Sequence, residues 1–293
     1  MLLPLLLQLS ELTFEPAPTP DEQEVIAAEV DAVRRLTVPV GVEGQAPVGF
    51  LIDTGAERTV LGNVVAAGLP GPRRTATLVH IAGRAPVEVV EVERLSLGRS
   101  VYRGIEAPIL PRATMGVDGI LGTDALQDQR VLFDFKAGRV TLIQPGERPS
   151  LGEVIVVRGR RKSGRLILTS ARIDGVTVDV VLDTGAAQTI ANPALADRLR
   201  RRGGTAGVLT SITGDTIALR LLAVRRLTIG DLLFQDFRIG VADSPAFAAL
   251  DLEERPAILL GMDAIAQFDQ VLVDFPRRTV AFALAPDARR VQR

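Results

Sequence analysis

The chain carries the tetrapeptide Asp-Thr-Gly-Ala twice, beginning at Asp53 and at Asp183, each time after an apolar run. Asp and Gly are common turn residues, so a single copy would be compatible with an ordinary strand-to-turn corner. Two copies with matching flanks indicate instead two carboxyl groups that act together. Carboxyl groups can serve as general acid and general base. The repeated tetrapeptide therefore predicts a paired-acid active site.

Other residue types narrow the chemistry further. The 293 residues include no Cys and a single His, His80, and the formal net charge is -1. Without Cys there is no thiol nucleophile, and one His leaves too few ligands for a zinc site of the usual kind. The sequence also lacks a Gly-x-Ser-x-Gly elbow, a phosphate-binding loop and a dinucleotide-binding glycine fingerprint. We therefore expect carboxylate chemistry with no metal, no cofactor and no nucleic acid partner.

Strands are the elements that must position the two aspartates. Apolar residues alternate with others through residues 48–52 and 176–182, and Asp53 and Asp183 directly follow these runs. A period of two is typical of a half-buried strand, so each aspartate is expected at a strand end. Asp183 follows Asp53 by 130 residues, and the similarity extends beyond the tetrapeptides. The sequence therefore predicts a duplicated unit.

Further features recur in the same order in both halves. Hairpins with a glycine at the tip are predicted around Gly83 and Gly214, which lie 30 and 31 residues after their aspartates. An apolar-apolar-Gly element follows in each half, at 120–122 and at 259–261. Strand-rich units of this length predict small β-barrels, so the expected fold class is all-β with two tandem barrels. Each half ends in an apolar run around one acid that we interpret as structural, Asp134 or Asp274.

Turn-forming and capping residues predict the domain organisation. The predicted parts are a leader at 1–21, a first domain at 22–144, a linker at 145–152, a second domain at 153–286 and a tail at 287–293. Thr19 as cap and Pro20 at the first helical position predict a short helix over residues 22–33. The second half is the longer one, and most of its extra residues fall within 241–257, which we interpret as a surface loop.

The first nine residues are apolar but too few to span a bilayer. They are similar to the hydrophobic part of a secretory signal, although a basic leader and a clear cleavage site are missing. We therefore expect a periplasmic or secreted protein, with a cytoplasmic location as the alternative. The leader is interpreted either as a signal or as a removable pro-segment.

Taken together, these motifs resemble the successive signatures of retropepsin-like aspartic proteases. The resemblance covers most of Val38 to Phe282. It implies that the two units form a pseudo-twofold dimer within one chain, with a cleft between them. The motifs that carry the resemblance are Asp53 to Leu61, the hairpin at Gly83 and Gly119 to Gly122, followed by Asp183 to Ile190, Gly214 and Ile258 to Gly261.

The resemblance also implies a role for each motif residue. Asp53 and Asp183 would be the catalytic pair. The hydroxyls of the two threonines would hydrogen-bond across the interface, and the two glycines would let the backbone approach the carboxylates. The implied active-site support residues are Thr54, Gly55, Ala56, Thr184, Gly185 and Ala186. The implied substrate-binding residues of the hairpin flaps are Ile81, Gly83, Ile212 and Gly214.

The implied activity is that of an aspartic endopeptidase acting on peptide or protein substrates through an activated water. Two carboxyl groups about 3 Å apart cannot both ionise, as is general for aspartic-protease pairs, so the pair holds one proton. Ala56 and Ala186 stand where pepsin-like enzymes carry Ser or Thr. We therefore expect the pair to titrate at higher pH than in those enzymes. With 4% aromatic residues, the cleft is expected to be aliphatic.

Two alternatives to an intramolecular peptidase stay open. The chain could be a catalytically inactive peptide-binding module on the same duplicated scaffold. It could also be a homodimer, in which Asp53 meets Asp53 of another molecule, instead of a monomer with an internal pseudo-dimer. His80, which has no counterpart in the second half, is expected in a flap or on the surface. The basic runs at 158–162 and 198–202 are interpreted as solvated turns.

Overall fold

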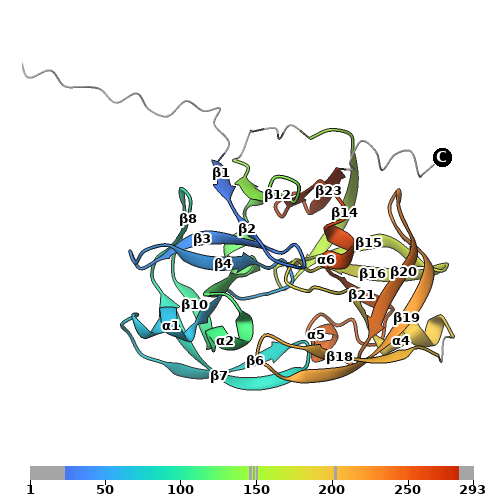
Figure 1. Ribbon diagram of the computed structural model, residues 1–293, viewed down its shortest axis with the longest axis horizontal. Coiled ribbons are helices and arrows are strands. Elements are labelled where there is room, and N and C mark those ends of the chain that lie inside the picture. Colours follow the sequence, from blue (N-terminus) through green and yellow to red (C-terminus); the bar gives the residue numbers. More distant parts are fainter. Residues whose placement is uncertain (1–23, 145–146, 148, 150, 201–202, 284–293) are drawn as a thin grey trace, which may run out of the picture.

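The computed structural model describes residues 24–144, 147, 149, 151–200 and 203–283. In Figure 1 the first half of the chain lies on one side and the second half on the other, and strands from both halves form a further sheet above them. Strands dominate, and the longest helix in the described part of the chain has six residues. The predicted all-β class is confirmed.

The first unit is built around a ring of strands. Its elements are β2 (Glu29–Val30), β3 (Leu36–Val42), β4 (Val48–Ile52), β5 (Val60–Gly62), α1 (Asn63–Ala67), β6 (Arg74–His80), β7 (Gly83–Val92), β8 (Leu95–Leu97), β9 (Ser100–Tyr102), β10 (Ile105–Leu110), α2 (Arg112–Met115), β11 (Gly119–Leu121) and α3 (Thr123–Leu126). Around the ring the order is β3-β4-β11-β5-β10-β7, and β8, which follows β7, pairs back with β3. The central strand β11 lies parallel to β4 and antiparallel to β5.

The second unit repeats this arrangement. Its elements are β15 (Arg165–Ile173), β16 (Val176–Leu182), β17 (Ile190–Ala191), α4 (Pro193–Arg198), β18 (Thr205–Thr210), β19 (Thr216–Ile229), β20 (Leu232–Val241), α5 (Pro245–Ala248), β21 (Ala257–Leu260) and α6 (Met262–Ile265). The order β15-β16-β21-β17-β20-β19 closes into a six-stranded barrel because β19 pairs with β15. Strand β21 lies parallel to β16 and antiparallel to β17, as β11 does in the first unit. Tandem β-barrel units are therefore confirmed.

A third sheet joins the two units. Its strands, in spatial order, are β1 (Glu24–Ala27), β13 (Arg139–Leu142), β12 (Arg130–Asp134), β22 (Gln270–Asp274), β23 (Thr279–Ala283) and β14 (Val154–Lys162). Leu132 lies opposite Leu272 at the middle of this sheet. Beside them Arg130 Nε contacts Asp274 Oδ2 at 2.9 Å, and Gln270 Nε2 donates to Asp134 at 2.9 Å. Both acids therefore contribute to the junction between units.

The helix predicted over residues 22–33 is wrong, because Glu24–Ala27 and Glu29–Val30 form β1 and β2. Strand β1 pairs with β13 along its whole length and buries Ile26. Pairing at the edge of a sheet satisfies backbone groups that a short isolated helix would leave open at its ends, and Val and Ile favour strands. The capping residues Thr19 and Pro20 lie outside the described residues.

The predicted leader at 1–21 and tail at 287–293 also lie outside the described residues, as does part of the predicted linker at 145–152. The limits of the two domains stay a prediction. Within the described part of the chain, no helix has the length and apolar character needed to cross a membrane.

The extra residues of the second unit are partly buried. The segment 241–257, predicted as a surface loop, contains α5, and its residues Phe247, Leu250 and Leu252 are 1%, 2% and 0% exposed. These side chains pack with barrel residues in one apolar cluster. The alternation of acidic and apolar residues in this segment leaves the acids exposed while the apolar side chains pack inward. The surface-loop prediction is therefore wrong for its apolar residues.

Candidate active site

Each aspartate of the repeated tetrapeptide lies at the end of a buried strand. Asp53 follows β4 and Asp183 follows β16, and the last residues of both strands are buried. The N–H of Asp53 donates to the carbonyl of Leu121 at 3.0 Å, and the N–H of Asp183 donates to that of Leu260 at 3.0 Å. The apolar-apolar-Gly strands β11 and β21 therefore fix the ends of the strands that deliver the acids.

Reciprocal hydrogen bonds join the two loops. Thr54 Oγ1 donates to the carbonyl of Leu182 at 2.8 Å, and Thr184 Oγ1 donates to that of Ile52 at 2.7 Å. Each hydroxyl also accepts a hydrogen bond from the backbone N–H of the opposite threonine, at 3.1 and 3.2 Å. Both threonines are buried. The cross-interface bonding that the resemblance implies is therefore present within one chain.

The two motif glycines make room for the carboxyl groups of the opposite unit. A Cβ atom on Gly185 would lie 2.2 Å from Asp53 Oδ2, and one on Gly55 would lie 2.5 Å from Asp183 Cγ. Such distances are far shorter than ordinary van der Waals contacts, so only glycine fits at these positions. Each carboxyl group thus packs directly on the loop of the other, and the two acids lie together at the junction.

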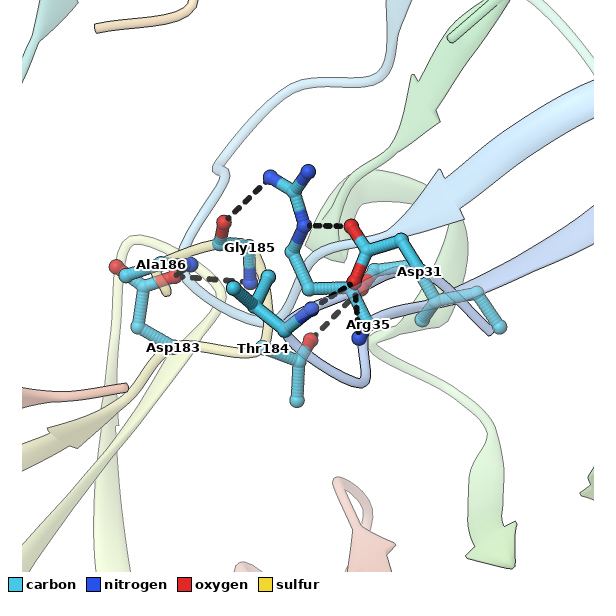
Figure 2. A network of polar contacts seen from close by, with 8 residues as sticks. Asp31, Arg35, Asp183, Thr184, Gly185 and Ala186 are labelled. Atoms are coloured by element: carbon cyan, nitrogen blue, oxygen red, sulfur yellow. Dashed lines mark hydrogen bonds and ion pairs between the residues drawn. The ribbon is translucent and has the colours of Figure 1, made fainter. Parts of the chain in front are cut away.

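Backbone N–H groups hold one oxygen of each carboxyl group. Asp53 Oδ1 accepts hydrogen bonds from Gly55 and Ala56 at 2.8 and 3.0 Å. Asp183 Oδ1 accepts the same pair from Gly185 and Ala186, the third and fourth residues of its own tetrapeptide, at 3.1 and 2.9 Å (Figure 2). Hydrogen bonds to a carboxylate favour its ionised form. The six predicted support residues therefore all contact the aspartate pair or the loops that carry it.

A second pair of acids, which sequence reasoning missed, braces the loops. The carboxylate of Asp124 accepts from the N–H of Thr59 at 3.0 Å and from its hydroxyl at 2.7 Å. Asp263 holds Thr189 in the same way, at 3.1 and 2.7 Å. Burial raises the pKa of both acids. The signal in the sequence is a Gly-x-Asp that follows each apolar pair.

Both predicted flaps are hairpins, β6-β7 and β18-β19, and each reaches the opposite unit. Ile81 packs against the apolar cluster of the second unit, whereas Ile212 packs against that of the first. Gly214 lies in the turn with φ of +90°, and a Cβ on it would lie 3.2 Å from a Thr114 methyl on α2. Gly83 is not at the tip but opens β7, directly after a two-residue turn.

Further contacts connect the hairpin tips to one another and to the opposite unit. Ser244 Oγ donates to the carbonyl of Ile81 at 2.6 Å, and His80 Nε2 lies 3.4 Å from Asp215 Oδ2 on the other hairpin. His80 is buried, so it belongs to a flap that rests on the opposite unit. The flaps are therefore closed over the junction and touch at their tips.

The duplication is also visible in a comparison with known families. The model of the aspartyl protease family matches residues 38–125 and again residues 169–264. The two matches cover more than half of the chain, and each contains one Asp-Thr-Gly-Ala loop. The chain belongs to the aspartyl protease family. A comparison with curated proteins gives no match. The resemblance to retropepsin-like members, with two units in one chain, is confirmed.

In this family member, burial dominates the electrostatics of the aspartate pair. Burial raises the pKa of Asp183 to about 7, and the neighbouring charge of Asp53 adds to the rise. Burial also raises the pKa of Asp53, against the N–H groups of Gly55 and Ala56 and the positive charge of Arg165. A pair of interacting acids loses its protons in two separate steps. The pair is therefore set to hold one proton over a range that extends toward neutral pH.

Two arginines that sequence reasoning missed also contact the loops of this family member. Arg165 Nε donates to the carbonyl of Gly55 at 2.6 Å, and Arg35 Nη1 donates to that of Gly185 at 3.3 Å. Figure 2 shows Arg35 between this carbonyl and the carboxylate of Asp31. The signal in the sequence is the spacing, because the two arginines are 130 residues apart, as the two aspartates are.

We expect the substitution Thr184→Val to destabilise the protein. It leaves the N–H of Thr54 and the carbonyl of Ile52 buried without their partner, and an unsatisfied buried group costs about 1–3 kcal/mol. The free energy of unfolding in urea should fall by about 3 kcal/mol. Thr184→Ser keeps the hydroxyl, so it should cost about 1 kcal/mol for the lost methyl group. Equal losses in both variants would contradict a role for the hydrogen bonds.

We expect Asp183→Asn to change how stability depends on pH. Because the pKa of Asp183 is about 7 in the folded chain and about 3.8 in the unfolded one, the folded state binds the extra proton between these values. The parent should therefore lose stability as pH rises from about 4 to 7, whereas the variant, which cannot ionise there, should lose less. Urea denaturation at several pH values measures this. The exposed Asp231→Asn serves as control and should keep the parent's slope.

Proposed function

We propose that the chain is an aspartic endopeptidase in which Asp53 and Asp183 form one active site within a single molecule. Membership of the aspartyl protease family supports a hydrolase that acts on peptide bonds. The observation that most favours one shared site is the reciprocal bonding of Thr54 and Thr184, which joins the two loops of the same chain. A monomer is part of this proposal.

In the proposed mechanism the two carboxyl groups share the acid and base work. The ionised member accepts a proton from a water molecule held between them, and the protonated member donates its proton to the carbonyl oxygen of the scissile bond. The oxygen of the water forms a bond to the carbonyl carbon, so no acyl-enzyme is needed. As the tetrahedral intermediate collapses, the C–N bond breaks and the nitrogen takes up a proton from the pair. The motif N–H groups keep both carboxyl groups oriented throughout.

The proposed substrates are peptide segments with apolar residues on either side of the cut. Apolar clusters flank the junction in both units, and their partly exposed members include Ala76 and Leu78 in one and Leu209 and Ile217 in the other. Burial of an apolar substrate side chain against such surfaces contributes roughly 25 cal/mol for each Å² removed from water. The two sides differ, because Phe247 on α5 belongs to the second cluster only. Preferences on the two sides of the cut are therefore expected to differ.

A cleavage assay with separate aspartate variants tests the single shared site. The parent should cleave members of a mixed peptide library, and both Asp53→Asn and Asp183→Asn should lose this activity, by about a thousandfold or more, because neither acid can do both tasks. Pepstatin, a general inhibitor of aspartic peptidases, should inhibit the parent. Sedimentation of the parent under assay conditions measures its oligomeric state.

Other outcomes identify the alternatives. Unchanged cleavage in either single variant would contradict a shared site. Activity that appears only in a dimer would indicate pairing between chains. Binding of library peptides by the parent without any cleavage would indicate a peptide-binding module in place of a peptidase.

The pH dependence of cleavage should be bell-shaped with a weakly acidic to near-neutral maximum. Activity should fall at low pH, where both acids are protonated, and again above about pH 7, where Asp183 loses its proton. Measurement of kcat/KM for one apolar peptide between pH 3 and 9 tests this expectation. A maximum below pH 4 would contradict it.

A further inference from the structure

The two arginines at the loops occupy matching places in the duplicated chain. Arg35 directly precedes β3, and Arg165 is the first residue of β15. Each guanidinium crosses the junction and donates to the carbonyl of the motif glycine of the other unit. The bond of Arg165 to Gly55 is short, at 2.6 Å, whereas that of Arg35 to Gly185 is 3.3 Å. Arg165 therefore holds its loop more tightly.

The positive charge of Arg35 is neutralised within its own unit. Its Nε lies 2.6 Å from Asp31 Oδ2, and the same carboxylate accepts hydrogen bonds from the N–H groups of Val33 and Arg35. Figure 2 shows this carboxylate beside the guanidinium. Arg35 therefore acts on the loop mainly as a hydrogen-bond donor, with its charge already paired.

Among the residues that the structure describes, no acid of its own unit pairs with Arg165 in this way. The hairpin that leads into it reads Arg161, Lys162, Ser163 and Gly164, so the residues before it are basic or neutral. Its ion pair is with Glu57 of the first unit, at 3.9 Å, and that glutamate side chain is half exposed. Arg165 itself is only 14% exposed at its side chain. Its charge is therefore sheltered from water and loosely paired, and water screens a sheltered charge less than an exposed one.

We propose that Arg165 is a positioning residue of the aspartate pair, which holds the Gly55 loop and supplies the positive charge that keeps one carboxyl group ionised in the closed site. The kinetic part of this inference rests on the proposed peptidase function. Arg35 performs only the equivalent of the first task, because it holds the Gly185 loop. The duplicated site is therefore electrostatically unequal although its backbone is nearly symmetric.

The charges around the pair agree with this assignment. Among the described residues, the charged groups at the two loops and in the segments leading into them include the ion pairs Arg165 with Glu57, Arg58 with Glu106, Arg35 with Asp31, Lys162 with Asp251 and Asp179 with Arg160 and Arg255, and the bracing acids Asp124 and Asp263. Burial is the main cause that raises the pKa of both pair members, and the positive charge of Arg165 opposes it in each. Removal of this charge should therefore move both protonation steps of the pair to higher pH.

Carboxyl titration of the folded protein tests the inference without requiring activity. Protein labelled with ¹³C at aspartate carboxyl carbons is titrated by NMR, with Asp53→Asn and Asp183→Asn used to assign the two signals. In Arg165→Gln both steps should move upward by about one pH unit, since a nearby opposite charge typically moves a carboxyl group by about one to three. The matched control is the double variant Arg35→Gln/Asp31→Asn, which removes the two paired charges together and should leave the steps in place. Circular dichroism checks that each variant is folded.

Arg165→Lys separates charge from geometry and serves if the Gln variant does not fold. Lysine cannot reproduce the guanidinium contact with Gly55, but it keeps the positive charge. Because the charge is retained, the titration should stay near that of the parent. In the kinetic arm, both limbs of the pH profile of kcat should move upward for Arg165→Gln and not for Arg35→Gln/Asp31→Asn or Arg165→Lys.

Each outcome either supports or overturns the proposed role of Arg165. Titration steps that do not move in Arg165→Gln, or that move equally in Arg35→Gln/Asp31→Asn, would overturn the inference, as would an equal shift in Arg165→Lys. If the parent cleaves no peptide, the proposed function fails, while the carboxyl titration still decides the role of Arg165.

Discussion

The hydrogen bonds between Thr54 and Thr184 determine whether the two aspartates can lie together at all. Each hydroxyl donates a hydrogen bond to a strand carbonyl of the opposite unit and accepts one from the backbone N–H of the opposite threonine. Neither loop can therefore move without breaking hydrogen bonds of both threonines. The groups involved are buried, and an unsatisfied buried polar group is costly. The strands that deliver the acids, the glycines that admit them and the arginines that cross the junction are all arranged around this one contact.

Opposing influences act on the protonation of the two carboxyl groups that these hydrogen bonds bring together. Burial favours the protonated forms of Asp53 and Asp183, whereas the N–H groups of each motif and the charge of Arg165 favour the ionised forms. Neither influence alone would suit the proposed mechanism, in which the pair donates one proton and accepts another. A fully exposed pair would ionise twice, and a buried pair without donors would not ionise near neutral pH. The backbone of the tetrapeptide supplies donors that do not depend on side-chain type.

Sequence patterns predicted the candidate site because residues suited to acid–base chemistry recur there in a repeated pattern. They failed for elements whose structure depends on partners far away in the sequence. Asp53 and Asp183 could be recognised because the tetrapeptide, its strand and its hairpin recur in order. The helix at 22–33 failed because its capping signal is local, whereas β13, which turns the segment into a strand, lies more than a hundred residues away. Arg165 escaped notice since its signal, the 130-residue spacing from Arg35, assigns no role to it until its contact with the opposite unit is known. The buried side of 241–257 failed for the same reason.

The joining sheet has a consequence for how the two halves can change over time. Leu132 faces Leu272 at the centre of a sheet to which each unit contributes three strands, an arrangement that two separate copies of one unit could also make. In such an assembly of identical copies, every substitution would appear on both sides of the cleft. Because one polypeptide contains both units, a single mutation alters one side only. Differences such as α5, or the acid of its own unit that pairs with Arg35 and has no described counterpart at Arg165, can therefore accumulate independently. Preferences on one side of the proposed cleavage site can then evolve without disturbing the other.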